Sequence, residues 1–160
     1  MAAPTNIARI MRELERALSD IEQNPRRPEA ELRRRAETVR RQLSGLTAAV
    51  LIANNRGRYI DVNRAATILT GYTRSELLRL SVADLTPTAN RATARRLWEQ
   101  FIERDRMSGA YPIRRRDGRI VRCRYMAVAN ILPGVHVSVL LTPALARALR
   151  TKPARRKKAS

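Results

Sequence analysis

AVLIANNRGRYIDVNRAATILTGYTRSELL, Ala49 to Leu78, is the stretch of sequence that decides the fold. It begins within a short apolar run, Ala48–Ala53, which is followed by the turn residues Asn54–Gly57. The next residues, Arg58–Val62, again suit a strand. Two such runs on either side of a turn that contains glycine are typical of a β-hairpin. The stretch therefore predicts two antiparallel strands.

Three helices are predicted after this hairpin. Asn63 suits the N-cap of a helix over residues 64–69, and Gly71 suits the position that ends it. Thr73–Glu76 matches the capping box and predicts a second short helix. Thr86-Pro87 opens a third and longer helix, because proline is favoured in a first helical turn.

Strand patterns return after Met107. Residues 110–116 and 119–131 flank Asp117-Gly118, a dipeptide typical of tight hairpins, and residues 135–141 form one more alternating run. The order of elements predicts an α+β domain with a five-stranded antiparallel sheet and short helices on one sheet face. Period two separates His136 from its neighbouring valines, and we expect His136 on the outer sheet face, under an N-terminal helix.

Two amphipathic helices are predicted before this domain, with a break between them at Pro25–Pro28 because prolines interrupt a helical hydrogen-bond ladder. Their apolar stripes can be buried in a helical hairpin, in a dimer bundle or as a lid on the domain. We expect dimerisation, and the predicted interface consists of Ile7, Ile10, Leu14, Leu18, Ile21, Leu32, Val39 and Leu43. The predicted boundaries are 1–45 for this helical segment, 46–142 for the domain, and 143–160 for a short helix with a basic, disordered tail.

Ala49–Leu78 resembles the first half of a PAS domain. The resemblance rests on Gly57, on Val62-Asn63 before a helix with Ala65-Ala66, on Gly71-Tyr72-Thr73 and on Glu76–Leu78. RRRDGRIVRCRYMAVANIL and the strand after it resemble the final strands of that family. The resemblance implies a five-stranded antiparallel sheet, a small cavity between sheet and helices, and dimerisation through flanking helices.

Family members that hold haem or flavin carry particular ligand residues. The haem-binding oxygen sensors of the family have a histidine on the long helix, and residues 86–104 contain none. The light-sensing flavin class has a cysteine after a short helix, where this chain has Ser81–Asp84. The cofactor therefore stays unknown, with haem and flavin disfavoured, and no metal site is predicted because the chain has one cysteine and one histidine.

A small-molecule ligand in the cavity is left open by the resemblance. Such cavities are concave and mostly apolar, with a few polar groups. The candidate lining residues are Asn63, Leu69, Leu78, Leu97, Phe101, Ile113, Val121, Cys123 and Tyr125. For Asn63 the reading as a helix cap is favoured over ligand binding, and for Cys123 the reading as a small buried apolar residue is favoured over a redox-active thiol.

Charge is the unusual feature of the composition. The chain holds 33 Lys and Arg against 14 Asp and Glu, a formal charge of +19, and residues 143–160 contain seven basic and no acidic side chains. This tail is predicted to contact polyanions such as nucleic acid without sequence specificity. The predicted contacts are Lys152, Arg155, Arg156, Lys157 and Lys158. Arginines at 114–116, 119, 122 and 124 form a second basic stripe. A solvated face is the favoured interpretation of this stripe, and a site for an anion or an acidic partner is the alternative.

We expect a cytoplasmic, non-enzymatic sensor that forms a homodimer and signals through a partner protein. No apolar run is long enough to span a membrane, and no secretory signal is evident at the start. No paired carboxylates, nucleophile–base set or phosphate-binding loop occurs at an interpretable spacing, which argues against an enzyme. The alternative is a nucleic-acid-associated regulator that uses the domain as a dimer scaffold.

Overall fold

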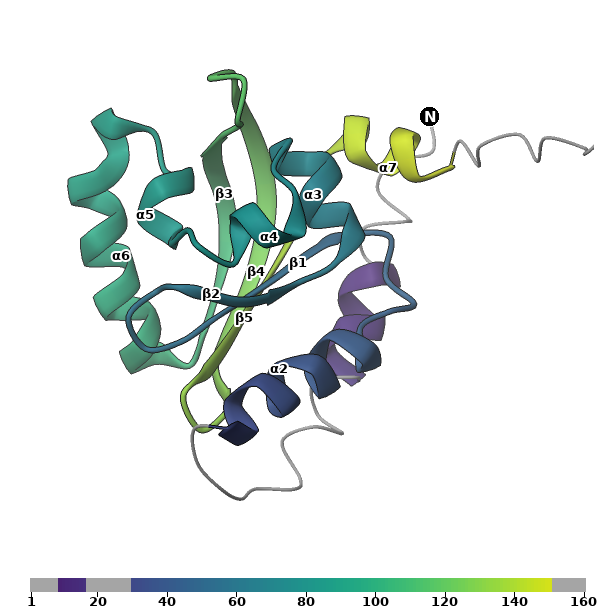
Figure 1. The fold of residues 1–160 in the computed structure, drawn as a ribbon, viewed down its shortest axis with the longest axis vertical. Helices are drawn as coiled ribbons and strands as arrows, with labels where there is room; N and C mark the ends of the chain where they lie inside the picture. Colours follow the sequence, from purple (N-terminus) through teal and green to yellow (C-terminus); the bar gives the residue numbers. More distant parts are fainter. Residues whose placement is uncertain (1–8, 17–29, 151–160) are drawn as a thin grey trace, which may run out of the picture.

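The centre of the structure is one antiparallel sheet of five strands (Figure 1). This computed structural model describes residues 9–16 and 30–150. The strands are β1 (Ala49–Ala53), β2 (Tyr59–Val62), β3 (Arg106–Arg114), β4 (Ile120–Leu132) and β5 (Val135–Leu141). Their order across the sheet is β2-β1-β5-β4-β3, so the first and last strands pair at its centre. The α+β class and the five-stranded sheet are confirmed.

Four helices cover one face of the sheet (Figure 1). They are α3 (Arg64–Thr70), α4 (Arg74–Leu77), α5 (Val82–Leu85) and α6 (Arg91–Arg104), with a 3-10 turn at Thr88–Asn90 before the last. The caps follow from local sequence. The Asn63 side chain accepts from the Ala66 N–H, Gly71 ends α3 at φ 76°, and Thr73 and Glu76 form the predicted capping box.

A further helix, α2 (Ala30–Gln42), covers the opposite face, where it lies against β2, β1 and β5. The sequence requires this cover because β1 is buried at all five positions. Its side chains alternate between the two faces: Leu51 belongs to the cluster under α3–α5, while Val50 and Ile52 belong to the cluster under α2.

Several of the N-terminal side chains predicted to form a dimer interface are buried within one chain. Val39 and Leu43 of α2 are 0% exposed within one chain, and Leu14, from the helical residues 9–16, joins them against the sheet. Ile10 is buried too, and Leu32 is half-buried against the same cluster. Within one chain these side chains therefore form a lid on the domain, and the predicted homodimer stays a prediction. Ile7, Leu18, Ile21 and the predicted break at Pro25–Pro28 lie outside the described residues.

The chain after the sheet forms α7 (Pro143–Arg150), the short helix predicted there. The Thr142 hydroxyl caps it by accepting from the Leu145 N–H, and the Leu145 side chain is buried beside α3. The five predicted polyanion contacts of the tail lie outside the described residues. Within the ranges that the structure describes, no helix is both long and apolar enough to cross a bilayer.

The predicted position of His136 on the outer sheet face is wrong. Its ring is 2% exposed on the opposite face and makes edge contacts with Trp98 and Phe101 of α6, at centroid distances of 5.6 and 6.0 Å. Alternation separates His136 from Val135 and Val137 correctly, but both faces of β5 are covered. The valines pack against the aliphatic side chains of α2, while the histidine packs against the aromatic face of α6.

Both ring nitrogens of His136 have protein partners. The Asn130 N–H donates to Nδ1 at 2.9 Å, so Nε2 carries the proton and donates to Asn55 Oδ1 at 2.7 Å. Burial lowers the His136 pKa from 6.5 to about 4, because the ring has little water to solvate a positive charge. A second proton on Nδ1 also removes the acceptor for Asn130. The fold therefore holds His136 neutral.

Lowering the pH should destabilise the protein through His136. Between about pH 6.5 and 4, His136 is protonated in the unfolded chain but stays neutral in the folded chain. The free energy of unfolding therefore falls as the pH falls, by at most roughly 3 kcal/mol. His136→Gln keeps an acceptor and a donor but removes the titration. Urea unfolding at several pH values should show a smaller slope in the variant. An equal slope in both proteins contradicts the assignment.

The lid should contribute a large part of the stability. Leu43→Ala removes a fully buried side chain and is expected to cost about 2–4 kcal/mol. Gln42→Ala, at an exposed neighbouring position, should cost under about 0.5 kcal/mol. Urea unfolding at two protein concentrations measures both, and the loss should not depend on concentration. If the urea midpoint of the wild type rises with protein concentration while that of Leu43→Ala does not, Leu43 lies in an interface between two chains instead.

Candidate functional site

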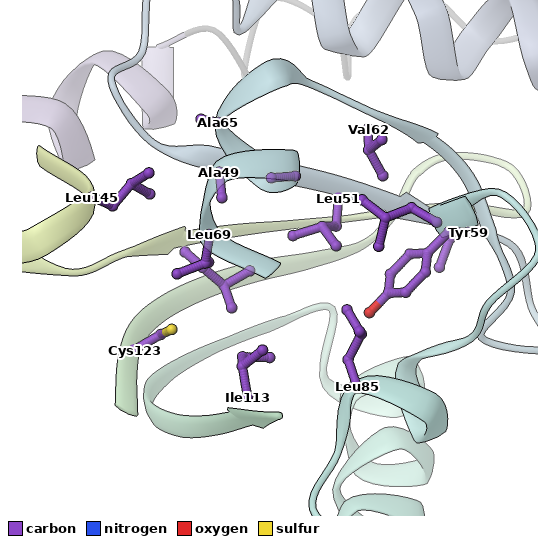
Figure 2. Packing of buried hydrophobic residues seen from close by; sticks show 14 residues of the cluster. Ala49, Leu51, Tyr59, Val62, Ala65, Leu69, Leu85, Ile113, Cys123 and Leu145 are labelled. Carbon is purple, nitrogen blue, oxygen red and sulfur yellow. The ribbon is translucent and has the colours of Figure 1, made fainter. Parts of the chain in front are cut away.

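A cavity of about 90 Å³ lies between the sheet and the helices of the α3–α6 face. Figure 2 shows part of the surrounding cluster, with Leu51, Tyr59, Leu69, Leu85 and Ile113 directed towards one interior region. The lining is apolar apart from a few hydroxyl groups. It consists of Leu51, Tyr59, Leu69, Thr70, Val82, Leu85, Ala94, Leu97, Trp98, Phe101, Met107, Tyr111, Ile113, Tyr125, Ala127, Ser138 and Leu140.

Five of the nine residues predicted from sequence line this cavity, and they come from four elements. Leu69 lies on α3, Leu97 and Phe101 lie on α6, and Ile113 and Tyr125 lie on β3 and β4. Their positions follow from period: α6 presents its apolar stripe to the sheet, and alternate residues of the β3–β4 hairpin face α6.

Asn63 and Leu78 lie elsewhere. Asn63 Oδ1 accepts from the N–H groups of Ala66 and Val50, and its amide donates to the Ala48 carbonyl, so the side chain joins α3 to the start of β1. The interpretation as a helix cap is confirmed. Leu78 is half-buried at the C-cap of α4, and its neighbour Leu77 takes the fully buried position instead.

Val121 and Cys123 belong to the same hydrophobic cluster but do not reach the cavity wall. Cys123 is 1% exposed and points into the cluster (Figure 2). Burial raises the pKa of its thiol to about 11, since nothing in this environment compensates for a thiolate charge. The protonated thiol packs as a small apolar group, in agreement with the interpretation favoured from sequence.

Sequence reasoning missed the hydroxyl groups of the wall, above all Tyr59 and Tyr111. The signal was available in both cases. Tyr59 alternates with Ile60, which packs against the α2 side, and Tyr111 shares its face of β3 with Ile113. Strand alternation alone therefore assigns both tyrosines to the cavity side.

The two tyrosines differ in how their hydroxyl groups are satisfied. Tyr111 shares a hydrogen bond with Thr86 at 2.8 Å. Tyr59 is 7% exposed, and its hydroxyl has no hydrogen-bond partner among the described residues. Figure 2 shows that this hydroxyl points towards Leu85 in the cluster interior. Burial raises the pKa of both phenols, so both stay neutral and act as hydrogen-bonding groups. The cavity wall carries no charged side chain.

A buried carboxylate at the sheet edge connects the cavity face with the lid. Asp61 of β2 is 3% exposed and accepts from Arg40 of α2 and from Arg74 of α4, each at 2.8 Å. Its Oδ1 also accepts from the Val62 N–H at 2.9 Å. These three side chains, Arg40, Asp61 and Arg74, form the Asp61 ion-pair cluster. It is the point where elements from opposite sides of the sheet hold the same group.

The one histidine of the chain is not placed as a haem ligand, and its one cysteine is not placed to link a flavin. His136 uses both ring nitrogens for protein hydrogen bonds, which leaves no lone pair for an iron. Cys123 lies on β4, outside the wall. Among the residues that the structure describes, no group of three or more His, Cys, Asp or Glu side chains is arranged to hold a metal ion.

Comparison with known proteins identifies the family to which this fold belongs. The model of the PAS fold family matches residues 37–142 and begins inside α2, before the predicted boundary at residue 46. No curated protein matches the chain significantly.

Three similar solved structures are PAS domains or sensory-box domains. A domain of a sensory box sensor histidine kinase/response regulator from Geobacter sulfurreducens has 22% identity and a TM-score of 0.55, with 61% of this chain and 85% of that one covered. A PAS domain from Colwellia psychrerythraea has 18% identity, a TM-score of 0.56 and coverage of 69% and 94%. A PAS domain in complex with ethanol, of a LuxR-family transcriptional regulator from Burkholderia thailandensis, has 14% identity, a TM-score of 0.52 and coverage of 61% and 89%.

At these identities the likeness to solved structures concerns the fold alone, while the family match spans most of the chain. The sheet order, the helices beside the cavity and the family model agree on one assignment. The chain belongs to the PAS family, and residues 37–142 are its PAS domain.

Proposed function

We propose that this PAS protein is a non-enzymatic sensor whose cavity takes a small uncharged ligand and whose output passes to a partner protein. The observation that carries the proposal is the cavity of about 90 Å³ with the unpartnered Tyr59 hydroxyl beside it. This hydroxyl borders the cavity and makes no hydrogen bond within the described residues, so a ligand with a polar group can bond to it.

The chemistry of the wall defines the ligand class. Because no lining side chain carries a charge, a charged ligand has no counter-ion and must lose its hydration. The volume is well below the roughly 300–1,000 Å³ of pockets that hold drug-sized ligands. A neutral molecule of a few non-hydrogen atoms with a hydroxyl or carbonyl group suits both limits. The related PAS domain from Burkholderia thailandensis is in complex with ethanol, a molecule of this class.

The proposed output uses the connection between the two sides of the sheet. PAS domains commonly serve as sensor modules in signalling proteins, and the similar Geobacter sulfurreducens domain is part of a sensor histidine kinase/response regulator. In this chain the Asp61 ion-pair cluster holds the lid helix α2 and the short helix α4 at once. A ligand that shifts the short helices therefore changes how firmly α2 is held against the sheet. This change in α2 alters the contacts of the protein with its partner.

Ethanol should bind in the cavity and depend on Tyr59. In ¹H–¹⁵N spectra of the full chain, ethanol is expected to shift the amides of lining residues such as Leu97 and Ile113. Tyr59→Phe removes one hydrogen bond of about 1 kcal/mol and should weaken ethanol binding about fivefold. Tyr72→Phe, at a partly buried tyrosine outside the wall, should leave it unchanged.

Charged molecules of similar size provide the second arm. Acetate and ethylammonium should leave the same amides unshifted at equal concentrations, because the wall has no counter-ion for either. The ligand assignment fails if ethanol shifts no lining amide, or if acetate binds as well as ethanol does.

Removing the Asp61 charge should release the lid. Asp61→Asn keeps the size of the side chain but abolishes both ion pairs, so hydrogen exchange of the α2 amides should accelerate about tenfold or more. Arg41→Gln, which breaks only the exposed Arg41–Glu37 pair on the same helix, should change α2 exchange little. Unchanged α2 exchange in Asp61→Asn would show that the cluster does not hold the lid.

A further inference from the structure

One part of the sheet lacks a helical cover on its outer face. α2 lies against β2, β1 and β5, while the far end of the β3–β4 hairpin extends away from it, at the top of Figure 1. Met126 still packs against the cluster under α2, and Arg124 and Arg122 follow it on the same face of β4. Ala110 and Pro112 of β3 lie directly opposite these two arginines. The uncovered face therefore combines small apolar residues with two positive charges.

Ile120 continues this row at the end of the strand. Its side chain is 61% exposed, and it is the single large hydrophobic side chain classed as exposed in the described part of the chain. Period two places Ile120 on the same face as Arg122 and Arg124, at intervals of about 7 Å along the strand. Isolated exposed apolar residues are common, but here the residue borders a charged, uncovered sheet surface.

The arginines of this hairpin are not equivalent. Of the six arginines between residues 114 and 124, four have partners: Arg114 donates to the Asp84 carbonyl, Arg115 to the Leu69 carbonyl, Arg116 pairs with Glu76, and Arg119 pairs with Asp117. The other two, Arg122 and Arg124, are exposed and pair with no acidic side chain of the described residues. Their charges are thus available to another molecule.

We propose that Ile120, Arg122 and Arg124 form a docking face for an acidic segment of a partner protein. The proposal rests on the proposed function for the existence of a partner, and it adds where the partner binds and what chemistry it presents. An extended segment repeats its side chains on one face every second residue, at the same spacing as this row. An apolar residue followed by carboxylates at that period meets Ile120 and both guanidinium groups, which bind carboxylates in a two-pronged geometry.

The composition of the face favours a protein over a nucleic acid. Neither tyrosine of the hairpin lies on it, because Tyr111 and Tyr125 face the cavity, so no aromatic ring on this part of the hairpin is available to stack on a base. Ile120 has no attractive partner in a phosphate backbone, whereas an apolar side chain of a protein segment covers it. Charge complementarity therefore selects an acidic segment with at least one apolar residue.

The test is a binding measurement with the full chain and a labelled peptide, Val-Thr-Glu-Thr-Glu-Thr-Glu, followed by fluorescence anisotropy at about 50 mM salt. Arg122→Gln with Arg124→Gln should weaken binding about tenfold or more, and Ile120→Ser about threefold. The matched control is Arg95→Gln with Arg96→Gln on α6, which removes the same charge from exposed arginines elsewhere and should change binding less than about twofold. A peptide with glutamine in place of glutamate should not bind.

Three results overturn the docking face. They are no binding of the acidic peptide, equal losses in the two double variants, and binding of a DNA duplex that depends more strongly on Arg122 and Arg124 than peptide binding does. The ethanol titration of the Arg122→Gln, Arg124→Gln protein separates this proposal from the sensor role. That double variant should keep the ethanol shifts of the wild type, because neither arginine lines the cavity. In the wild type, ethanol shifts without peptide binding reject the docking face alone, whereas absent ethanol shifts reject the cavity.

Discussion

The structure depends on a central pair of strands that is apolar on both faces. β1 is buried at every position, and β5 carries Val137 and Val139 towards α2 while His136 and Leu140 face the helices beside the cavity. The face under α2 includes Val50, Ile52, Val137 and Val139, and each side chain loses about 1.5–3 kcal/mol if it is exposed. Their sum is of the order of the whole stability of a domain, about 5–15 kcal/mol. The lid is therefore part of the folding unit, which agrees with a family match that begins inside α2.

The opposite face is packed less completely, and its defect is the cavity. Long side chains of α6 and the tyrosines of β2, β3 and β4 surround the space without filling it. Close-packed interiors seldom leave such space, because each unfilled volume removes dispersion contacts from its wall. The Tyr59 hydroxyl in this wall also has no hydrogen-bond partner among the described residues. The site is therefore a region where packing and hydrogen bonding are both left incomplete by the chain itself.

The sequence predicts those features that depend on neighbouring residues. Asn63, Gly71 and the Thr73–Glu76 capping box are fixed by local backbone geometry, so helix starts and ends follow from them. Period two likewise separates His136 from the valines of β5. Period two does not show which face of the sheet His136 and which face the valines occupy, because both faces are buried and the alternation looks the same either way. The same limit explains the N-terminal stripe: a heptad-like pattern records that Val39 and Leu43 are buried, not which surface buries them.

The sequence likewise predicts which residues of the candidate site are buried, but not which of them line the cavity. Leu69, Leu97, Phe101, Ile113 and Tyr125 were identified because amphipathic faces converge on the interior. Whether a buried residue borders a cavity or only the surrounding core depends on distances across the sheet, and these are set by tertiary packing. Cys123 and Val121 are on the correct face but lie behind the wall. Tyr59 and Tyr111 were omitted although alternation places them correctly.

The Asp61 ion-pair cluster has a stoichiometry that matters. Two guanidinium groups share one buried carboxylate, and the two arginines repel each other across it. Departure of either arginine leaves the other with the whole carboxylate and without its repulsive neighbour, and a lone remaining pair is held more strongly than before. The holds on α2 and on α4 thus compete. A movement that draws Arg74 away from Asp61 tightens Arg40 on the same carboxylate, which makes this edge of the sheet a point of exchange between its two sides.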